Sequence, residues 1–336
     1  MGTDLLRRKL RIQAWTKRTG RNPQIRGYVF DGYEWAVELD LSKYFDTLNH
    51  EKLLNLLRKE VTDERVIQLI KKFLKSGVME NGIRIATEEG SPQGGPLSPL
   101  LANIYLHEFD KEYEKRGVPV IRYADDIVLL CKSKRAAERL LESSTRYLEG
   151  KLKLKVNREK SRVTRIASRE NFKFLGFAFR KYKEDVLIRV HPKTLKKAKA
   201  KLHELTRRSQ GRNVRQVMEK QKLFMQGWLN YYGLADMKST AEKLDQWLRR
   251  RYRMYIWKQW KKPQTRYRNL RKLGVPEKHA RMTAGSRQSY WAASDFSAVK
   301  RAITKERLER AGYFNISLAY ESIHEACILR TVAHTM

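Results

Sequence analysis

Three aspartates stand at positions where they could bind a divalent metal ion. Asp125 and Asp126 are adjacent and lie between two short apolar runs, 118–121 and 127–131, that have the length and composition of strands. Neighbouring carboxylates repel each other unless a cation lies between them, and carboxylate oxygens are the ligands that Mg²⁺ prefers. The pair alone is a weak signal, because two acids in a turn are more commonly just solvated.

A second acidic position strengthens the metal hypothesis. Residues 34–41 alternate between polar and apolar side chains, as a half-buried strand does, and Asp40 stands at the end of the segment. If the two apolar runs form a hairpin with its turn at residues 124–126, the hairpin tip and this strand end could bring three carboxylates together. Three carboxylates are the minimum for two Mg²⁺ ions about 3.5–4 Å apart, which activate a hydroxyl and stabilise a leaving pyrophosphate.

The composition points to a nucleic-acid partner. The chain has 336 residues, 72 Lys and Arg against 37 Asp and Glu, and a formal net charge of +35. No apolar run approaches the ~18 residues that span a bilayer, so no membrane segment is expected. Basic residues are spread along the chain with aromatic residues among them, which favours nucleic acid over a membrane surface. Cys131 and Cys327 are the only cysteines and form no zinc-binding pair, as is typical of a reducing cytoplasm.

Helices and strands alternate around the acids. Apolar periodicity and capping residues predict helices at 49–60, 62–75, 97–116 and 134–148, and alternation predicts strands at 152–156, 172–179 and 186–190. Asn81-Gly82 predicts the turn of a hairpin over 77–87. Gly94 and Gly95 allow the backbone to approach a ligand closely before the third helix, although such a turn is common before any helix.

Residues 193–272 have a different composition. They carry 24 Lys and Arg against 5 Asp and Glu, and their periodicity predicts helices at 193–208, 214–231 and 240–257. In the third of these helices, a series of arginines is followed in the sequence by large aromatic residues. That pattern suits a surface that binds phosphates and stacks bases, although a run of charge is more commonly a solvated face. We therefore expect RNA contacts from Arg249, Arg250, Arg251, Arg253 and Trp257.

A series of segments resembles the motifs of the reverse transcriptase/maturase proteins encoded by bacterial group II introns. Residues 40–46 resemble the first palm motif, 91–106 the Ser-Pro-Gln-Gly-Gly helix motif, and 122–126 the palm hairpin. The segments 154–160 and 172–179 resemble the next palm motif and the primer-grip strand, and 227–232 resembles the maturase signature. The resemblance implies an α+β fold: a polymerase palm, with an antiparallel sheet and packed helices, followed by an α-helical thumb/maturase domain.

The resemblance also implies a role for individual residues. Two Mg²⁺ ions would be held by Asp40, Asp125, Asp126 and the backbone carbonyl of Leu41, with Asp126 assisting the primer end. Lys160 would protonate or neutralise the leaving pyrophosphate. The incoming dNTP would contact Phe45, which excludes the 2′-OH of ribonucleotides, and a pocket lined by Gln93, Gly94 and Gly95.

Four regions are expected. They are a basic N-terminal arm over 1–27, a reverse transcriptase palm over 28–191, a helical thumb/maturase region over 192–273 and a C-terminal part of the maturase region over 274–336. The arm does not match the fingers region of the family. No cysteine pairs of the kind found in the family's C-terminal endonuclease follow the maturase region.

The activity implied by the resemblance is RNA-directed DNA synthesis together with splicing assistance. The protein would bind its intron RNA and extend a DNA primer on an RNA template, within a ribonucleoprotein of the bacterial cytoplasm. The unmatched fingers leave an alternative, in which a polymerase-inactive homologue acts only as an RNA-binding maturase.

Overall fold

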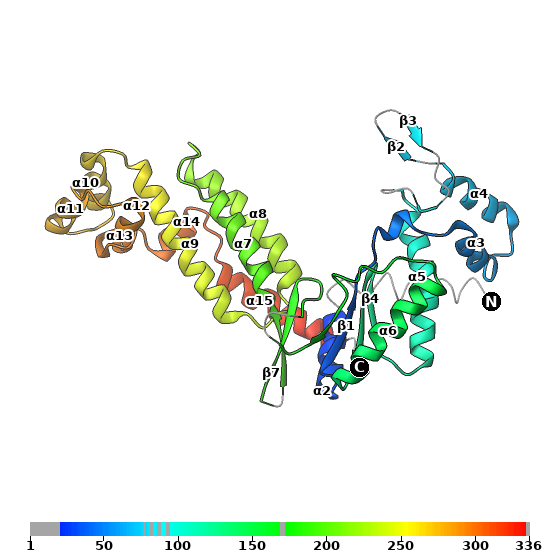
Figure 1. The fold of residues 1–336 in the computed structure, drawn as a ribbon. Coiled ribbons are helices and arrows are strands. Elements are labelled where there is room, and N and C mark those ends of the chain that lie inside the picture. The colour runs from blue at the N-terminus through cyan, green and yellow to red at the C-terminus, as the bar shows by residue number, and fades with distance from the viewer. Residues whose placement is uncertain are drawn as a thin grey trace. The chain divides into compact units, whose positions relative to one another are not determined.

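The computed structural model describes residues 21–76, 78–80, 83–85, 89–91, 95–168, 172–183 and 185–333. The chain divides into two compact units, Met1–Leu187 and Ile188–Met336, each with a hydrophobic core of its own (Figure 1). The division lies close to the boundary expected between palm and thumb at residues 191 and 192.

The first unit is built on a four-stranded antiparallel sheet. Its strands lie in the order β4 (Val120–Tyr123), β5 (Asp126–Cys131), β1 (Trp35–Leu39) and β6 (Arg162–Arg165). The register of β1 and β5 pairs Val37 with Leu129 and Leu39 with Ile127. Because paired residues on neighbouring strands point to the same side, these four side chains share one face, and all four belong to the core of the unit.

Helices cover the apolar face of this sheet. The helices α5 (Ser98–Lys115) and α6 (Lys134–Gly150) pack against strands, and α3 (His50–Arg58) packs against α5 and α4 (Glu64–Leu74) (Figure 1). Side chains of Asn49, Asp63 and Ser133 accept a backbone hydrogen bond at the start of α3, α4 and α6. The four helices expected in this region are confirmed, and the combination of helices with an antiparallel sheet confirms the α+β class.

The segment 152–156 is not the strand that its alternation predicted. The N–H groups of Leu152 and Leu154 donate to carbonyls of Tyr147 and Leu148 at the end of α6, and Lys153 has a left-handed φ of 56°. Only Val156 forms a bridge, with Leu41. The alternating leucines are buried because the segment folds back under its own helix.

The aromatic segment 172–179 is a turn followed by a strand. Phe174 and Phe177 pair across a turn in which Leu175 and Gly176 have φ of 50° and 86°, so β7 (Phe177–Tyr182) begins only at its end. β7 pairs with β8 (Asp185–Val190), the hairpin partner expected. The strands β2 (Val78–Glu80) and β3 (Ile83–Ile85) form the other hairpin expected, whose Asn81-Gly82 turn lies outside the described residues.

The helix α2 (Arg21–Phe30) crosses the boundary expected at residue 27 between arm and palm. Arg26 donates to Asp185 at 2.8 Å, and Ile25 and Val29 are buried. The end of the expected arm is therefore part of the folded unit. The physical reason is that Ile25 and Val29, four residues apart, form an apolar helix face that is buried in the unit.

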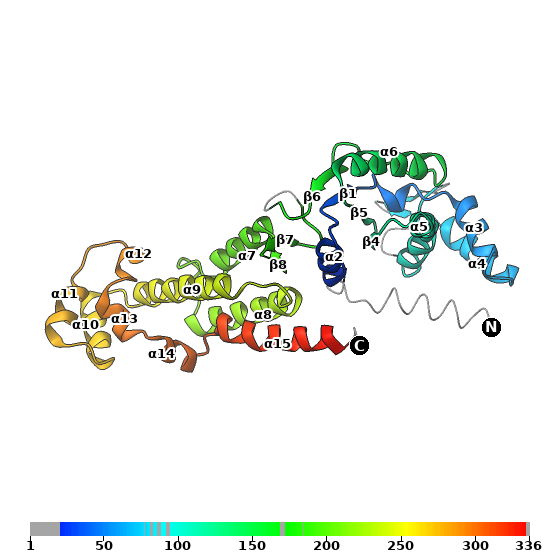
Figure 2. The same ribbon diagram turned by 90° about the horizontal axis from the view of Figure 1, so that it is seen from below.

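After the last residues of β8, the described elements of the second unit are all helices. Its elements are α7 (Pro192–Leu205), α8 (Val214–Tyr232), α9 (Lys238–Gln259), α10 (Pro263–Lys272), α11 (Glu277–Ala284), α12 (Tyr290–Ala293), α13 (Ser297–Ala302), α14 (Lys305–Arg310) and α15 (Ile316–Ala333). The helices α8, α9 and α15 run side by side (Figure 2). The three helices expected between 193 and 257 are confirmed. Within the described part of the chain, no helix is both long enough and apolar enough to cross a membrane.

Candidate active site

Asp40 and Asp126 lie opposite each other at the ends of neighbouring strands. Leu39 pairs with Ile127 in the antiparallel register of β1 and β5, so the next position sets Asp40 opposite Asp126. Both side chains belong to the face of the sheet that points away from the apolar core. They line a hollow of about 140 Å³ on that face, together with Glu38, Lys160 and Lys173.

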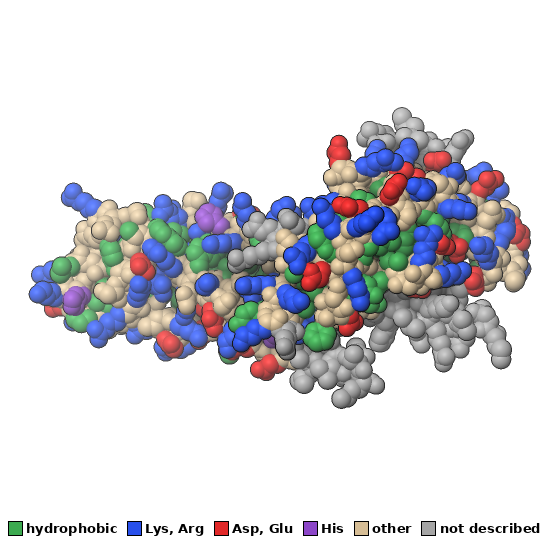
Figure 3. Space-filling view, turned by 60° about the horizontal axis from the view of Figure 1, so that its bottom comes forward, with side chains coloured by type: hydrophobic (Ala, Val, Ile, Leu, Met, Phe, Trp, Pro, Cys, Tyr) green, Lys and Arg blue, Asp and Glu red, His purple; other side chains and the backbone are tan. Residues whose placement is uncertain are grey.

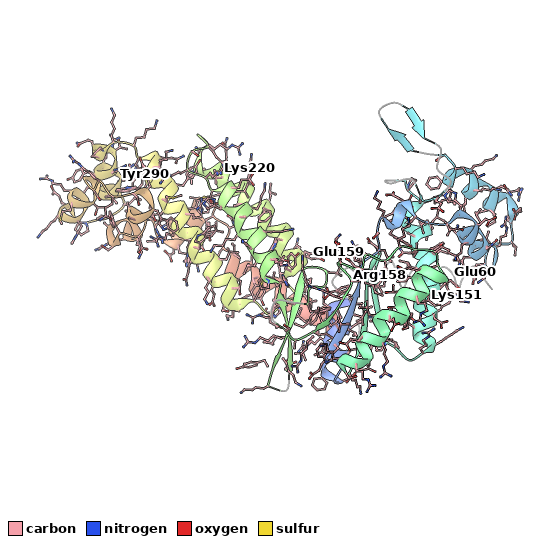
Figure 4. All side chains as sticks on the ribbon, in the orientation of Figure 1. Glu60, Lys151, Arg158, Glu159, Lys220 and Tyr290 are labelled. Atoms are coloured by element: carbon pink, nitrogen blue, oxygen red, sulfur yellow. The ribbon has the colours of Figure 1, made fainter. Side chains whose placement is uncertain are left out.

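Hydrogen bonds to a neighbouring loop fix the position of Asp40. Its N–H donates to Oγ of Ser161 at 3.0 Å, and its carbonyl accepts from the N–H of Asn157 at 2.8 Å. The same loop carries Lys160, whose Nζ lies 3.5 Å from Oδ2 of Asp40, and Figure 4 labels the two residues before it. The side chains of Lys160 and Asp40 are 70% and 41% exposed, so this ion pair is weak and a phosphate group can replace the carboxylate as the partner of Lys160.

Asp125 lies at the tip of the β4–β5 hairpin. Tyr123 pairs with Asp126 across the turn, and Ala124 adopts a left-handed φ of 53°. The turn is therefore Ala124-Asp125, one residue shorter than expected, because Asp126 already belongs to β5. The side chain of Asp125 is exposed and is not among the residues that line the hollow. The structure thus brings Asp40, Asp126 and Lys160 together and leaves Asp125 beside them.

Glu38 is a further acid on this face that the motifs did not single out. It pairs with Val128 in the register of β1 and β5, so it points to the same side as Asp40 and Asp126. Its carboxylate accepts from Oγ1 of Thr164 at 2.7 Å and lies 3.3 Å from Nε of Arg162. Burial raises the pKa of Glu38, and the hydrogen bond from Thr164 opposes that rise. Its position two residues before Asp40 in an alternating strand was the available signal.

The oxygen donors of this hollow suit a Mg²⁺ ion. Asp40 and Asp126 offer carboxylate oxygens to the same space, and Leu41 follows Asp40 in the chain without lining the hollow. Among the described residues, no three His, Cys, Asp or Glu side chains converge into a group that could hold a metal by themselves. This donor set fits the usual mode of Mg²⁺, which binds through one or two carboxylates, water and substrate phosphates.

The residues expected to contact the nucleotide lie between the first motif and α5. Phe45 is half-buried in the short helix η2 (Tyr44–Asp46), and its carbonyl accepts from the N–H of Ser91 at 2.6 Å. Gly95 is described just before α5, whereas Gln93 and Gly94 lie outside the described residues. The contact between Phe45 and Ser91 brings the first motif and the start of the Ser-Pro-Gln-Gly-Gly segment together.

Gly90 allows this close contact. Its φ is +90°, and a Cβ at this position would lie 2.8 Å from the carbonyl oxygen of Asp46. Its N–H donates to the carbonyl of Leu48 at 2.7 Å, and its own carbonyl lies 2.6 Å from Nε2 of the buried His50. Only glycine fits both the left-handed backbone and the space.

We expect Gly90→Ala to lower the free energy of unfolding by about 2 kcal/mol, through backbone strain and displacement of Asp46. Urea unfolding measures the change. Gly227→Ala is the matched control, because a Cβ on this glycine of α8 meets nothing within 4 Å. That substitution should raise the free energy of unfolding by about 0.5–1 kcal/mol. Equal stability of Gly90→Ala and the wild type would contradict the close contact.

The structure corrects the expectation that Trp257 and Arg251 contact RNA. Trp257 is 1% exposed and Arg251 is 6% exposed, both within the core of the second unit. The guanidinium of Arg251 donates to Thr206 Oγ1 and to the carbonyls of His203 and Thr206 at the end of α7. Burial lowers the pKa of Arg251 to about 10, which leaves it protonated at neutral pH. It caps α7, because a cation at a helix C-terminus binds the last carbonyls favourably.

The other three arginines of the expected RNA surface also make contacts within the unit. Arg249 lies 3.2 Å from the buried Asp245, and Arg250 stacks on Trp291 at 4.2 Å. Arg253 donates to the carbonyl of Ser294 at 3.0 Å. Arg250 and Arg253 thus attach α9 to α12 and Ser294, whereas Arg249 forms its ion pair within α9. All three arginines are half-buried, so their replacement would alter the fold of the unit as well as its charge.

Two family models match the chain. The model of the reverse transcriptase (RNA-dependent DNA polymerase) matches residues 17–179, and the model of the group II intron, maturase-specific domain, matches residues 195–274. The fold and the acids at its strand ends thus define a reverse-transcriptase domain that precedes a maturase-specific domain. Together the two matches confirm the resemblance of the chain to the reverse transcriptase/maturase proteins of group II introns.

Several curated proteins are similar to this chain in sequence. Protein YkfC of Escherichia coli is 35% identical over 176 aligned positions, which cover 42% of this chain and 46% of the relative. The group II intron-encoded protein LtrA of Lactococcus lactis is 30% identical over 215 aligned positions, which cover 45% of this chain and 36% of the relative. The chain thus spans less than half the length of these relatives. A solved telomerase from Candida Tropicalis is 12% identical with a TM-score of 0.45, covering 100% of this chain and 54% of that chain.

Proposed function

We propose that this protein is an RNA-directed DNA polymerase and a maturase, which extends a DNA primer on an RNA template with dNTPs and binds intron RNA to assist its splicing. The observation that supports the proposal best is the placement of Asp40 opposite Asp126, with Lys160 beside them, in one hollow at the sheet face. These groups have the charges that nucleotidyl transfer requires.

Each residue of the hollow has a role in this proposal. Two Mg²⁺ ions would be held by Asp40, Asp126, Asp125 and the Leu41 carbonyl, and they would supply charge neutralisation at the triphosphate and activation of the primer 3′-OH. Lys160 would exchange its contact with Asp40 for the leaving pyrophosphate, which it stabilises or protonates. Phe45 would lie beneath the sugar and exclude the 2′-OH, and the segment 93–95 would line the nucleotide pocket.

The contact between Lys160 and Asp40 supports a second function. Nζ of Lys160 lies 3.5 Å from Oδ2 of Asp40, so a metal ion would have to replace Lys160 as the partner of this carboxylate. A chain with this arrangement could act as an RNA-binding maturase without DNA synthesis.

Primer extension on an RNA template, with Mg²⁺ and dNTPs, separates the two functions. DNA product that requires both the template and Mg²⁺ would support the polymerase. Absence of product, together with retained binding of structured RNA, would reject the polymerase and support the maturase alone. In either case we propose that the protein works in a ribonucleoprotein of the bacterial cytoplasm, with intron RNA as its partner.

Exposed lysines of the second unit are the proposed RNA surface, in place of the buried arginines. The exposed lysines on α7 are Lys193, Lys196, Lys197, Lys199 and Lys201. Figure 3 shows Lys and Arg side chains spread over the face of this unit, and Lys220 projects from α8 in Figure 4. Phosphate contacts of this kind bind RNA with little dependence on sequence.

We expect the combined replacement Lys193→Ala, Lys196→Ala and Lys197→Ala to weaken RNA binding and to flatten its salt dependence. The slope of log affinity against log salt should fall by roughly 0.7 for each lost contact with a single strand. Lys201→Ala is the control, because Nζ of Lys201 already lies 3.1 Å from Glu204. An unchanged slope in the triple variant would remove α7 from the RNA surface.

A further inference from the structure

Arg122 is a buried charge two residues before the hairpin tip that carries Asp125. It is 5% exposed and forms an ion pair with Asp110 of α5, with Nη2 2.6 Å and Nε 2.9 Å from the carboxylate oxygens. Its third nitrogen, Nη1, donates to Oδ1 of Asn103 at 2.9 Å and to the carbonyl of Ala124 at 3.1 Å. All three nitrogens of this guanidinium are thus engaged, two by α5 alone and the third by α5 and the turn.

The contact with Ala124 falls at the strained position of the turn. Ala124 has a φ of 53°, a region that glycine adopts readily and that L-residues other than asparagine and aspartate rarely adopt. The left-handed residue directs the chain so that Asp125 lies at the tip and Asp126 starts β5 opposite Asp40. A donor fixed on the Ala124 carbonyl opposes rotation of this peptide, which would move both acids.

The partners of Arg122 on α5 hold its guanidinium group in a fixed position beside the turn. Asp110 and Asn103 lie seven residues apart on α5, so they share one face of the helix across two turns. His107, on the turn between them, has Nδ1 4.0 Å from Oδ2 of Asp110. The helix α5 begins at Ser98, three residues after Gly95, and contacts the turn through Arg122.

A role in stability alone does not explain why Arg122 and Asp110 form a buried ion pair. Buried ion pairs contribute little net stability compared with apolar residues of similar volume, so the pair need not be there to stabilise the fold. Arginine, in contrast to lysine, holds several acceptors in one plane at the same time. The geometry of Arg122 uses that property for one carboxylate, one amide and the turn carbonyl.

We propose that Arg122 is a positioning residue that holds the Ala124-Asp125 turn, and with it Asp125 and Asp126, in the geometry for nucleotidyl transfer. Asp110 and Asn103 fix Arg122 itself. This inference rests on the proposed polymerase function. Arg122 touches no substrate; it acts through the peptide of Ala124. The signal in the sequence was a charged residue inside an apolar strand, 120–123.

The test compares two variants with the wild-type chain. The pair Arg122→Met with Asp110→Leu replaces the buried ion pair by apolar side chains and should stay folded. Arg122→Lys keeps a positive charge beside Asp110 but removes the guanidinium group that donates to the Ala124 carbonyl. This second variant replaces the first in the test if the first does not fold. The control is Arg116→Gln with Glu112→Gln, which removes a partly exposed ion pair at 2.6 Å at the C-terminal end of α5.

We expect kcat of primer extension to fall about 10²-fold in the Met/Leu variant and less in the Lys variant, because misplacement by about 1 Å has effects of that size. The affinity for primer–template should stay within about 3-fold of wild type, because no nucleic-acid contact is removed. Amide hydrogen exchange in 120–131 should be faster, and exchange in α3 and α4 unchanged. The control should match the wild type in all measurements.

A rescue experiment separates positioning from general damage. Adding Ala124→Gly to the Met/Leu variant should restore about 10-fold of the lost kcat, because glycine adopts the left-handed φ without strain. Wild-type kcat in a folded Met/Leu variant would overturn the proposal, as would a loss that Ala124→Gly leaves unrelieved. If the wild-type chain extends no primer, the polymerase function has failed. In that case the amide hydrogen exchange of residues 120–131 tests the role of Arg122 by itself. Equal exchange rates in the Met/Leu variant and the wild type would overturn that role.

Discussion

Asp40→Asn is expected to reduce primer extension by on the order of 10³-fold or more, while leaving the free energy of unfolding nearly unchanged. Asp40 is 41% exposed in its side chain, and its backbone, not its carboxylate, makes the hydrogen bonds that fix the strand end. Asparagine keeps the shape but removes the negative charge that a Mg²⁺ ion requires, and loss of one such electrostatic contact in a site has effects of this size.

The measurement is single-turnover extension of a DNA primer on an RNA template, with RNA affinity determined in parallel. Affinity should stay the same or rise slightly, because a negative charge that repels phosphate has been removed. Asp63→Asn is the control, since Asn can replace Asp as the cap of α4. Extension by Asp40→Asn at the wild-type rate would rule out the hollow as the active site, and a large loss of RNA affinity would contradict a metal-binding role.

Trp257→Ala is expected to lower the free energy of unfolding by about 3–5 kcal/mol, the usual loss for a large aromatic residue removed from a core. The side chain is 1% exposed, its ring lies 5.8 Å from that of Trp260, and the guanidinium of Arg266 covers it at 4.8 Å. Truncation leaves a cavity between α9 and α10 that surrounding side chains cannot fill.

Urea unfolding of the second unit, followed alongside RNA affinity at low urea, checks this expectation. Stacking on a base predicts the opposite pattern: unchanged stability and a loss of about 1–3 kcal/mol in binding. That outcome would restore Trp257 to the RNA surface. Lys197→Ala, an exposed change on α7, should alter stability by no more than about 0.5 kcal/mol.

Much of this protein could be predicted from local pattern. Periodicity placed the helices α3 to α6 and the three long helices from α7 to α9, but not α2, and alternation in 34–41 marked β1 as a half-buried strand. The position of Asp40 at the end of that strand, and of Asp125 and Asp126 beside the hairpin turn, followed from the same rules. These features depend on which side chains recur at a fixed spacing, and that information lies within each segment.

The arginine-rich helix shows where local pattern was read incorrectly. Its composition indicated a surface, yet Leu244, Leu248, Arg251 and Tyr255 recur at spacings of four, three and four residues and form the buried side of α9. Arg251 could be placed inside because the end of α7 supplies carbonyl acceptors for it. Those acceptors lie 45 or more residues away along the chain, so only the tertiary structure identifies them.

The sequence and the tertiary structure each determined part of the candidate site. The sequence by itself determined the acids, their order and the strands that carry them. The tertiary structure decided the register, which sets Asp40 opposite Asp126, adds Glu38 to the same face and leaves Asp125 at the exposed tip. It also decided that Arg122, on β4, contacts both Asn103 of α5 and the Ala124 carbonyl. Register and long-range ion pairs depend on how separate segments pack against each other, and the spacing of residues within one segment does not contain that information.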